Sequence, residues 1–65
     1  MEQEPRYSVN DIVEFINELG NYCYGVVVAI YIVGRVAIYD IEINDDYLGT
    51  VVKRGIMESE ITSKK

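Results

Sequence analysis

The chain has 65 residues, of which 49% are hydrophobic and 26% charged, with six tyrosines and a single proline. This length leaves room for one thin core and no second domain, because a domain of this size buries only about 60% of the surface that its unfolded chain exposes, and the composition excludes intrinsic disorder. Eleven acidic residues against six basic ones give a formal net charge of -5. This charge disfavours nonspecific nucleic-acid binding, because binding to the phosphate backbone needs clustered Lys and Arg.

Cysteine usage and the apolar segments indicate where the protein works. Cys23 is the only cysteine, so no intramolecular disulfide can form. The N-terminal sequence is acidic and lacks the positive and apolar regions of a signal peptide. The apolar run at residues 22–34 is too short for a membrane helix. We therefore expect a cytoplasmic protein that does not enter a membrane.

Residues 8–20 fit two secondary structures. As a helix, they have an N-cap at Ser8, a weak capping box and Gly20 near the C-cap. The apolar residues then form a stripe at helical spacing: Val9, Ile12, Val13, Ile16 and Leu19. As a strand, residues 12–16 alternate, with Val13 and Phe15 on one face, between turns at residues 10–11 and 17–21. Propensity alone leaves both possibilities open.

A long β-strand is predicted for residues 22–33, which are rich in β-branched and aromatic side chains. Its apolar residues do not alternate cleanly, which indicates burial on both faces, a bend, or an edge that pairs with another copy. Gly34 predicts a turn, and residues 35–43 predict the returning strand. The later half of that strand alternates, which predicts one face in the core. The core face carries Tyr39, Ile41 and Ile43.

The remaining elements are short. Residues 44–46, Asn-Asp-Asp, form a turn cluster whose side chains can bond their own backbone. A third strand is predicted for residues 50–53 and is ended by Gly55. Residues 56–60 predict a tight turn or one helical turn that leads to Ile61.

Four segments have an order and spacing that can be compared with known folds: Tyr7-Ser8-Val9-Asn10-Asp11-Ile12-Val13, Gly25-Val26-Val27, Tyr39-Asp40-Ile41-Glu42 and Gly55-Ile56-Met57-Glu58-Ser59-Glu60-Ile61. Together they resemble the small Src-homology-3-like (SH3-like) barrels of bacteria and their phages, which share their shape with Tudor and KOW modules. The resemblance implies an all-β, five-stranded barrel with one short helical turn before the last strand. Residues 7–62 would form the barrel, with a disordered N-terminal tail at residues 1–6 and a C-terminal tail at residues 63–65.

Two departures from that pattern limit what it implies. Asn10 stands where glycine is common in the family, which Asn tolerates because it accepts left-handed backbone angles. The Ala-Leu-Tyr-Asp-Tyr signature of proline-rich-peptide binders is absent, and the chain has no tryptophan. The resemblance therefore implies a fold and no ligand. The alternative fold is α+β, with an N-terminal helix and an antiparallel sheet.

The chain carries few groups that could do chemistry. It has no histidine, which removes the commonest general base and the favoured metal ligand. Cys23 lies in the most apolar run, which is typical of a buried thiol rather than a nucleophile. The acidic pairs, Asp45 with Asp46 and Glu58 with Glu60, lack the six or more oxygens at set offsets that a calcium loop supplies. We expect no enzyme, no cofactor and no metal site.

Tyrosine is present in excess of what so small a core can bury. Exposed tyrosines supply large contact areas at low entropic cost. We expect a protein-binding surface formed by Tyr22, Tyr24, Tyr31, Tyr47, Asp45 and Asp46. The leading hypothesis is a small non-catalytic protein-binding module, an adaptor or inhibitor encoded by a phage or other mobile element. The alternative reading is that the tyrosines only cover the barrel.

Two other functions stay open. A nucleic-acid- or ribosome-associated module, as Tudor and KOW relatives often are, would need Arg35, Lys53 and Arg54 to converge. A self-assembling structural subunit would use the strand at residues 22–33 as an edge. That strand offers more apolar surface than one small barrel can bury, which predicts a homodimer. We expect a protein partner, and no binding to generic nucleic acid or to membranes.

Overall fold

The fold is mostly β. The computed structural model describes residues 4–45 and 47–65. Its elements are β1 (Ile12–Ile16), β2 (Tyr22–Val33), β3 (Val36–Asp45), β4 (Gly49–Met57), a 3-10 turn η1 (Glu58–Glu60) and β5 (Ile61–Lys64). Among these residues there is no helix with the length and apolar character needed to cross a bilayer. The expected helical turn before the last strand is confirmed as η1.

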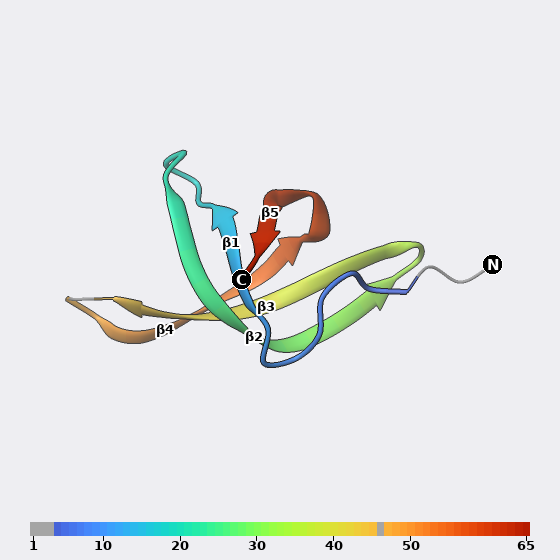
Figure 1. Cartoon of the computed structure of the whole chain (residues 1–65), viewed down its shortest axis with the longest axis horizontal. Helices are drawn as coiled ribbons and strands as arrows, with labels where there is room; N and C mark the ends of the chain where they lie inside the picture. Colours follow the sequence, from blue (N-terminus) through green and yellow to red (C-terminus); the bar gives the residue numbers. More distant parts are fainter. Residues whose placement is uncertain (1–3, 46) are drawn as a thin grey trace.

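The five strands form one antiparallel sheet in the order β4-β3-β2-β1-β5. β2 curves strongly, so that its first half pairs with β1 and its second half with β3 (Figure 1). The β2–β3 and β3–β4 hairpins extend in opposite directions from the centre (Figure 1). The molecule is therefore elongated, with extents of 43 × 21 × 20 Å.

Residues 12–16 form strand β1, so the α+β alternative with an N-terminal helix is wrong. Val13 and Phe15 are buried against the neighbouring strands. The helical stripe would instead have placed Ile12, Ile16 and Leu19 in the core, and all three are exposed. The helical and the strand pattern of this segment are of similar strength. Pairing with β2 on one side and β5 on the other selects the strand.

Short polar side chains close the turns on both sides of β1. Asn17 Oδ1 accepts hydrogen bonds from the backbone N–H groups of Leu19 (2.9 Å) and Asn21 (3.0 Å). On the other side, Asp11 Oδ2 accepts one from the Ser8 N–H (2.8 Å). These are the local bonds by which Asn and Asp compete with helical hydrogen bonding. The strand interpretation of residues 8–20, with its two bounding turns, is confirmed.

Two strand boundaries differ from those expected. β4 continues past Gly55 instead of ending there, because the strand takes up the glycine in a bulge. Arg54 and Gly55 together lie opposite Asp40, and Gly55 has a φ of 74°. β5 runs through Lys64, and the Lys65 N–H donates to the Ile12 carbonyl (2.8 Å), so the sheet extends past the boundary expected at residue 62.

The core is small and centred on Tyr39, as predicted for that residue. It consists of Val13, Phe15, Val27, Ala37, Tyr39, Ile41 and Ile61. The Tyr39 hydroxyl donates to Glu58 Oε2 (2.8 Å) and accepts a long bond from the Tyr7 N–H (3.4 Å). The Tyr7 ring packs edge-on against the Tyr39 ring, with centroids 5.7 Å apart. One buried hydroxyl thus connects the N-terminal segment, β3 and η1.

The segment before β1 was expected to be a disordered tail through residue 6. Residues 1–3 lie outside the described residues. The Arg6 N–H donates to Glu58 Oε2 (3.2 Å), and Arg6 Nε lies 3.8 Å from Glu58 Oε1. The chain is therefore attached to η1 at Arg6, one residue before the expected start of the domain.

Stability should fall at alkaline pH because of Tyr39. Burial first, and the hydrogen bond to Glu58 second, raise the pKa of Tyr39 to about 12, whereas tyrosine in an unfolded chain ionises near pH 10. A pKa raised by folding gives stability that is fully present below about pH 10 and is lost as the pH rises toward 12. Urea unfolding at a series of pH values between 8 and 12 measures this loss.

Replacing Tyr39 with Phe separates this effect from general alkaline damage. The Tyr39→Phe variant should be less stable than the wild type near pH 8 by about 1–2 kcal/mol, because Glu58 and the Tyr7 N–H lose a partner. It should then lose less additional stability above pH 10. The exposed Tyr22 provides the control, Tyr22→Phe, which should behave like the wild type. Equal alkaline losses in all three proteins would contradict the assignment.

Candidate functional site

A groove opens where β2 and β3 separate. Their pairing ends at Val26 and Glu42, beyond which the start of β2 follows β1 and the end of β3 follows β4 (Figure 1). Gly25 lies next to this point, and a Cβ on it would meet the Ile41 side chain and lie 2.7 Å from the Glu42 carbonyl oxygen. Only glycine permits this close approach of two backbones. The separation of the strands begins at this contact.

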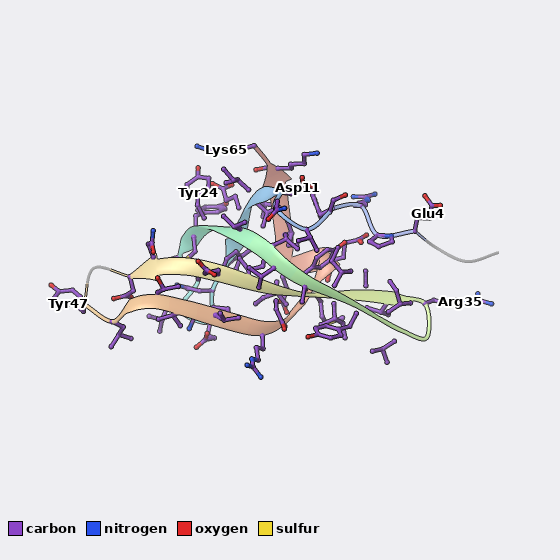
Figure 2. All side chains as sticks on the ribbon, turned by 90° about the horizontal axis from the view of Figure 1, so that it is seen from below. Glu4, Asp11, Tyr24, Arg35, Tyr47 and Lys65 are labelled. Carbon is purple, nitrogen blue, oxygen red and sulfur yellow. The ribbon has the colours of Figure 1, made fainter. Side chains whose placement is uncertain are left out.

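The groove is open to solvent and has a volume of about 460 Å³. We call it the tyrosine groove. Its lining comes from β2, from β3 and from the turn after β3: Cys23, Tyr24, Ile43, Asn44, Asp45 and Tyr47. Figure 2 shows Tyr47 at the tip of the β3–β4 hairpin and Tyr24 on the neighbouring strand. Tyr24 is about half exposed and Tyr47 is 97% exposed, so the Tyr47 ring and part of the Tyr24 ring face solvent.

Asp45 contributes a carboxylate to the lining of the groove. Its Oδ1 accepts hydrogen bonds from the backbone N–H groups of Tyr47 (2.7 Å) and Leu48 (2.9 Å). These bonds, that from Leu48 first, lower the pKa of Asp45, so the group is ionised at neutral pH. The expectation that this turn bonds its own backbone is confirmed for Asp45, while Asp46 lies outside the described residues.

Tyr24 already contacts charged groups. Its register partner across the strands is Glu14, and the Tyr24 hydroxyl is the main cause of the lowered pKa of Glu14, followed by Thr62. The Thr62 hydroxyl donates to Glu14 Oε1 (3.0 Å). The Lys65 ammonium lies 4.3 Å from the centroid of the Tyr24 ring, a cation–π contact. One face of the Tyr24 ring is therefore occupied by an ammonium group of the same chain.

The other two tyrosines expected at the site, Tyr22 and Tyr31, lie outside the groove. Tyr22 is exposed opposite Ile16 and does not line the groove. Tyr31 lies in the second half of β2, half exposed, and its hydroxyl donates to Asp40 Oδ2 (3.1 Å). Of the six residues expected from the sequence, the groove brings together Tyr24, Asp45 and Tyr47.

The remaining lining residues were not predicted from the sequence. Ile43 was assigned to the core face, Cys23 was expected to be a buried thiol, and Asn44 was seen only as a turn residue. Cys23 is in fact partly exposed, and its Sγ accepts a hydrogen bond from Asn17 Nδ2 (3.3 Å). The one available signal was Gly25, since an isolated glycine inside an apolar strand can mark a close backbone approach.

The three basic residues considered for nucleic acid do not converge. Arg35 lies in the β2–β3 turn, and Figure 2 shows it at the opposite end of the molecule from Tyr47. Lys53 pairs in register with Ile41. Ile41 is six residues after Arg35, and six residues of extended chain span about 20 Å. Lys53 Nζ also lies 3.5 Å from Glu18 Oε1.

The chemistry available in the groove is recognition of a cation. Two aromatic rings and an ionised carboxylate attract positive charge. Within residues 4–45 and 47–65, no three carboxylate or thiol side chains lie close enough together to hold a metal ion.

Comparison of the chain with protein-family models, with curated protein sequences and with solved structures found no match.

The contact at Gly25 gives a stability test. The Gly25→Ala variant should be destabilised by about 1–3 kcal/mol, because the added methyl group must displace Ile41 or the β3 backbone. The Tyr47→Ala variant, which loses only exposed contacts, should stay within about 0.5 kcal/mol of the wild type. Urea unfolding at neutral pH measures both. Equal stability of Gly25→Ala and the wild type would mean that the two strands do not need this close approach.

Proposed function

We propose that this chain is a small non-catalytic protein-binding module whose tyrosine groove takes an Arg or Lys side chain from a basic segment of a partner protein. The observation that carries the proposal is that Tyr24 and Tyr47, from different elements, line one groove together with the ionised Asp45. The charged head of the partner side chain would contact the rings and the carboxylate, and its aliphatic stem would lie against Ile43.

Charge and energetics support this choice of ligand. A cation over an aromatic ring contributes about 0.5–2 kcal/mol, depending on its exposure to water. The net charge of -5 adds a long-range attraction for a basic partner. The contact between Lys65 and Tyr24 is an internal example of the same interaction. Aromatic anchors of this kind carry most of the binding energy in protein interfaces.

The proposal includes the fold and the setting inferred from the sequence. We propose that the sheet curls into an SH3-like barrel, supported by the strand order with β5 beside β1 and by the position of η1 between β4 and β5. In this proposal the protein is an adaptor or inhibitor of a phage or other mobile element and works in the cytoplasm. The nucleic-acid alternative lacks the convergence of Arg35, Lys53 and Arg54 on which it depends.

Titration with fluorescent peptides tests the groove. A short peptide that carries Arg and Lys should bind at physiological salt, and the same peptide with Gln at every basic position should not. Tyr47→Ala should weaken binding by about 2 kcal/mol. Asp45→Asn should also weaken binding, because Asn can keep the hydrogen bonds of the turn while losing the charge. Fluorescence anisotropy gives the dissociation constants.

Tyr22→Ala is the matched control, because Tyr22 is an exposed tyrosine outside the groove. It should bind the basic peptide like the wild type. Equal losses in Tyr22→Ala and Tyr47→Ala would contradict the assignment to the groove, as would equal binding of the neutral peptide. Double-stranded DNA should not bind at the same salt concentration. DNA binding that disappears when Lys53 and Arg54 are replaced would favour the nucleic-acid alternative.

Binding should be insensitive to mild acid. The folded-state pKa of Asp45 is lowered by the backbone N–H groups of Leu48 and Tyr47, so the group stays ionised to a lower pH than an ordinary aspartate. We expect the affinity for the basic peptide to stay constant between pH 7 and about pH 5, measured by the same anisotropy titration. A marked loss of affinity over that range would mean that another titrating group controls binding.

A further inference from the structure

The second half of β2 has an open edge. β2 pairs with β1 only as far as Val26. The segment before β1 bonds it only at Val27, through the Asn10 N–H (2.8 Å) and the Asp11 carbonyl (2.9 Å). Beyond Val27, β2 has β3 on one side and, among the described residues, no backbone hydrogen-bond partner on the other.

The hairpin geometry identifies the groups on this edge. The β2–β3 turn has two residues between the register partners Val33 and Val36, and its first residue, Gly34, has a φ of 62°. Such a hairpin closes with a pair that exchanges both hydrogen bonds, and hydrogen-bonded pairs then alternate along the ladder. Tyr31 therefore bonds to β3, whereas the backbone N–H and C=O groups of Ile30 and Ile32 point to the open edge.

We propose that this edge pairs with the same edge of a second copy of the chain. The two β2 strands run antiparallel about a twofold axis at Tyr31. Ile30 of each copy faces Ile32 of the other, so the outward N–H and C=O groups of both residues find partners. The two five-stranded sheets then join through their β2 strands.

The residues along this edge are compatible with pairing between the same edges of two copies. Residues 26–33 carry no charge, so two chains of net charge -5 can approach here without placing like charges opposite each other. In this register, Arg35 of one copy comes beside Asp11 of the other, because Asp11 is bonded to Val27 at the end of the open stretch. The Asp11 carboxylate also lies 3.5 Å from Lys64 Nζ of its own copy. Isolated strand edges in monomers usually carry Lys, Pro, a bulge or an inward-pointing charge; residues 29–33 have none of these, and the bulge at Val28 lies at the end of the open stretch.

The exposed side chains of the hairpin favour the same arrangement. Tyr31, Ile32 and Val33 are each more than half exposed, as is unusual for a strand interior. At the axis, the two Tyr31 residues form a pair without backbone bonds, the type in which facing side chains lie closer. Aromatic pairs at such positions stabilise strand pairing. Ile32 would be covered by Ile30 of the second copy.

Disulfide trapping tests the register. Facing residues in a pair without backbone bonds have Cα atoms about 4.5 Å apart, within the range of a disulfide. In a Cys23→Ala background, Tyr31→Cys should form a covalent dimer with oxidised glutathione at micromolar concentration, seen on a non-reducing gel. Tyr47→Cys in the same background is the control, since Tyr47 is more exposed and lies at the opposite end of the molecule from Arg35 in the β2–β3 turn (Figure 2). Absence of the Tyr31→Cys dimer, or equal trapping of both variants, would overturn the proposal.

Sedimentation tests the association without a cross-link. The wild type should sediment as a dimer at tens of micromolar, and Tyr31→Lys should sediment as a monomer with an unchanged circular dichroism spectrum. Tyr47→Lys should remain dimeric. A monomeric wild type would overturn the proposal, as would a dimeric Tyr31→Lys. Peptide binding to the tyrosine groove is measured separately, so loss of either proposal leaves the other intact.

Discussion

The hydrogen bond from the Tyr39 hydroxyl to Glu58 (2.8 Å) holds the start of β5 and the N-terminal segment against the core. A fully buried tyrosine must have a partner for its hydroxyl, because an unpaired polar group in the core costs about 1–3 kcal/mol. Glu58 is the first residue of η1, and η1 turns the chain from β4 into β5. The same carboxylate accepts the Arg6 N–H. The positions of β5 beside β1 and of the N-terminal segment over the core therefore depend on one buried side chain in β3.

Asp40, the next residue along β3, lies beside two of the three bulges in the sheet. Val28 in β2 is the extra residue of one bulge, and Arg54 with Gly55 in β4 form the other. The buried Asp40 carboxylate accepts the Gly55 N–H (3.3 Å) and the Tyr31 hydroxyl (3.1 Å). Bulges increase local twist and bend. The curvature of β2 and β4 is thus concentrated beside one acidic residue of the central strand.

Much of the secondary structure followed from the sequence because it reflects local chemistry. The β-branched run in β2, the alternation that buried Tyr39 and Ile41, and the turn closed by Asp45 are all properties of neighbouring residues. The length of β4 was missed, because the effect of Gly55 depends on Asp40 across the sheet. The segment at residues 8–20 stayed ambiguous for the same reason, since only pairing with β2 and β5 separates its two patterns.

The candidate site was predictable only in part. An excess of tyrosine over what the core can bury indicated that several would be exposed, and Tyr24 and Tyr47 are. Which of them gather in one place depends on the point where β2 leaves β3. That point is set by contact of Gly25 with Ile41 and Glu42, far away in the sequence. No pattern along the chain specifies such a contact.

The elongated shape, 43 Å long, has a consequence for how the two ends of the molecule can change. At physiological ionic strength, salt screens charges beyond about 8 Å, so a charge gained or lost near Tyr47 has little influence near Arg35 at the other end (Figure 2). The surface at either hairpin tip can therefore accumulate substitutions with little electrostatic effect on the opposite tip. A chain of 65 residues in this way gains two surfaces that selection can act on independently.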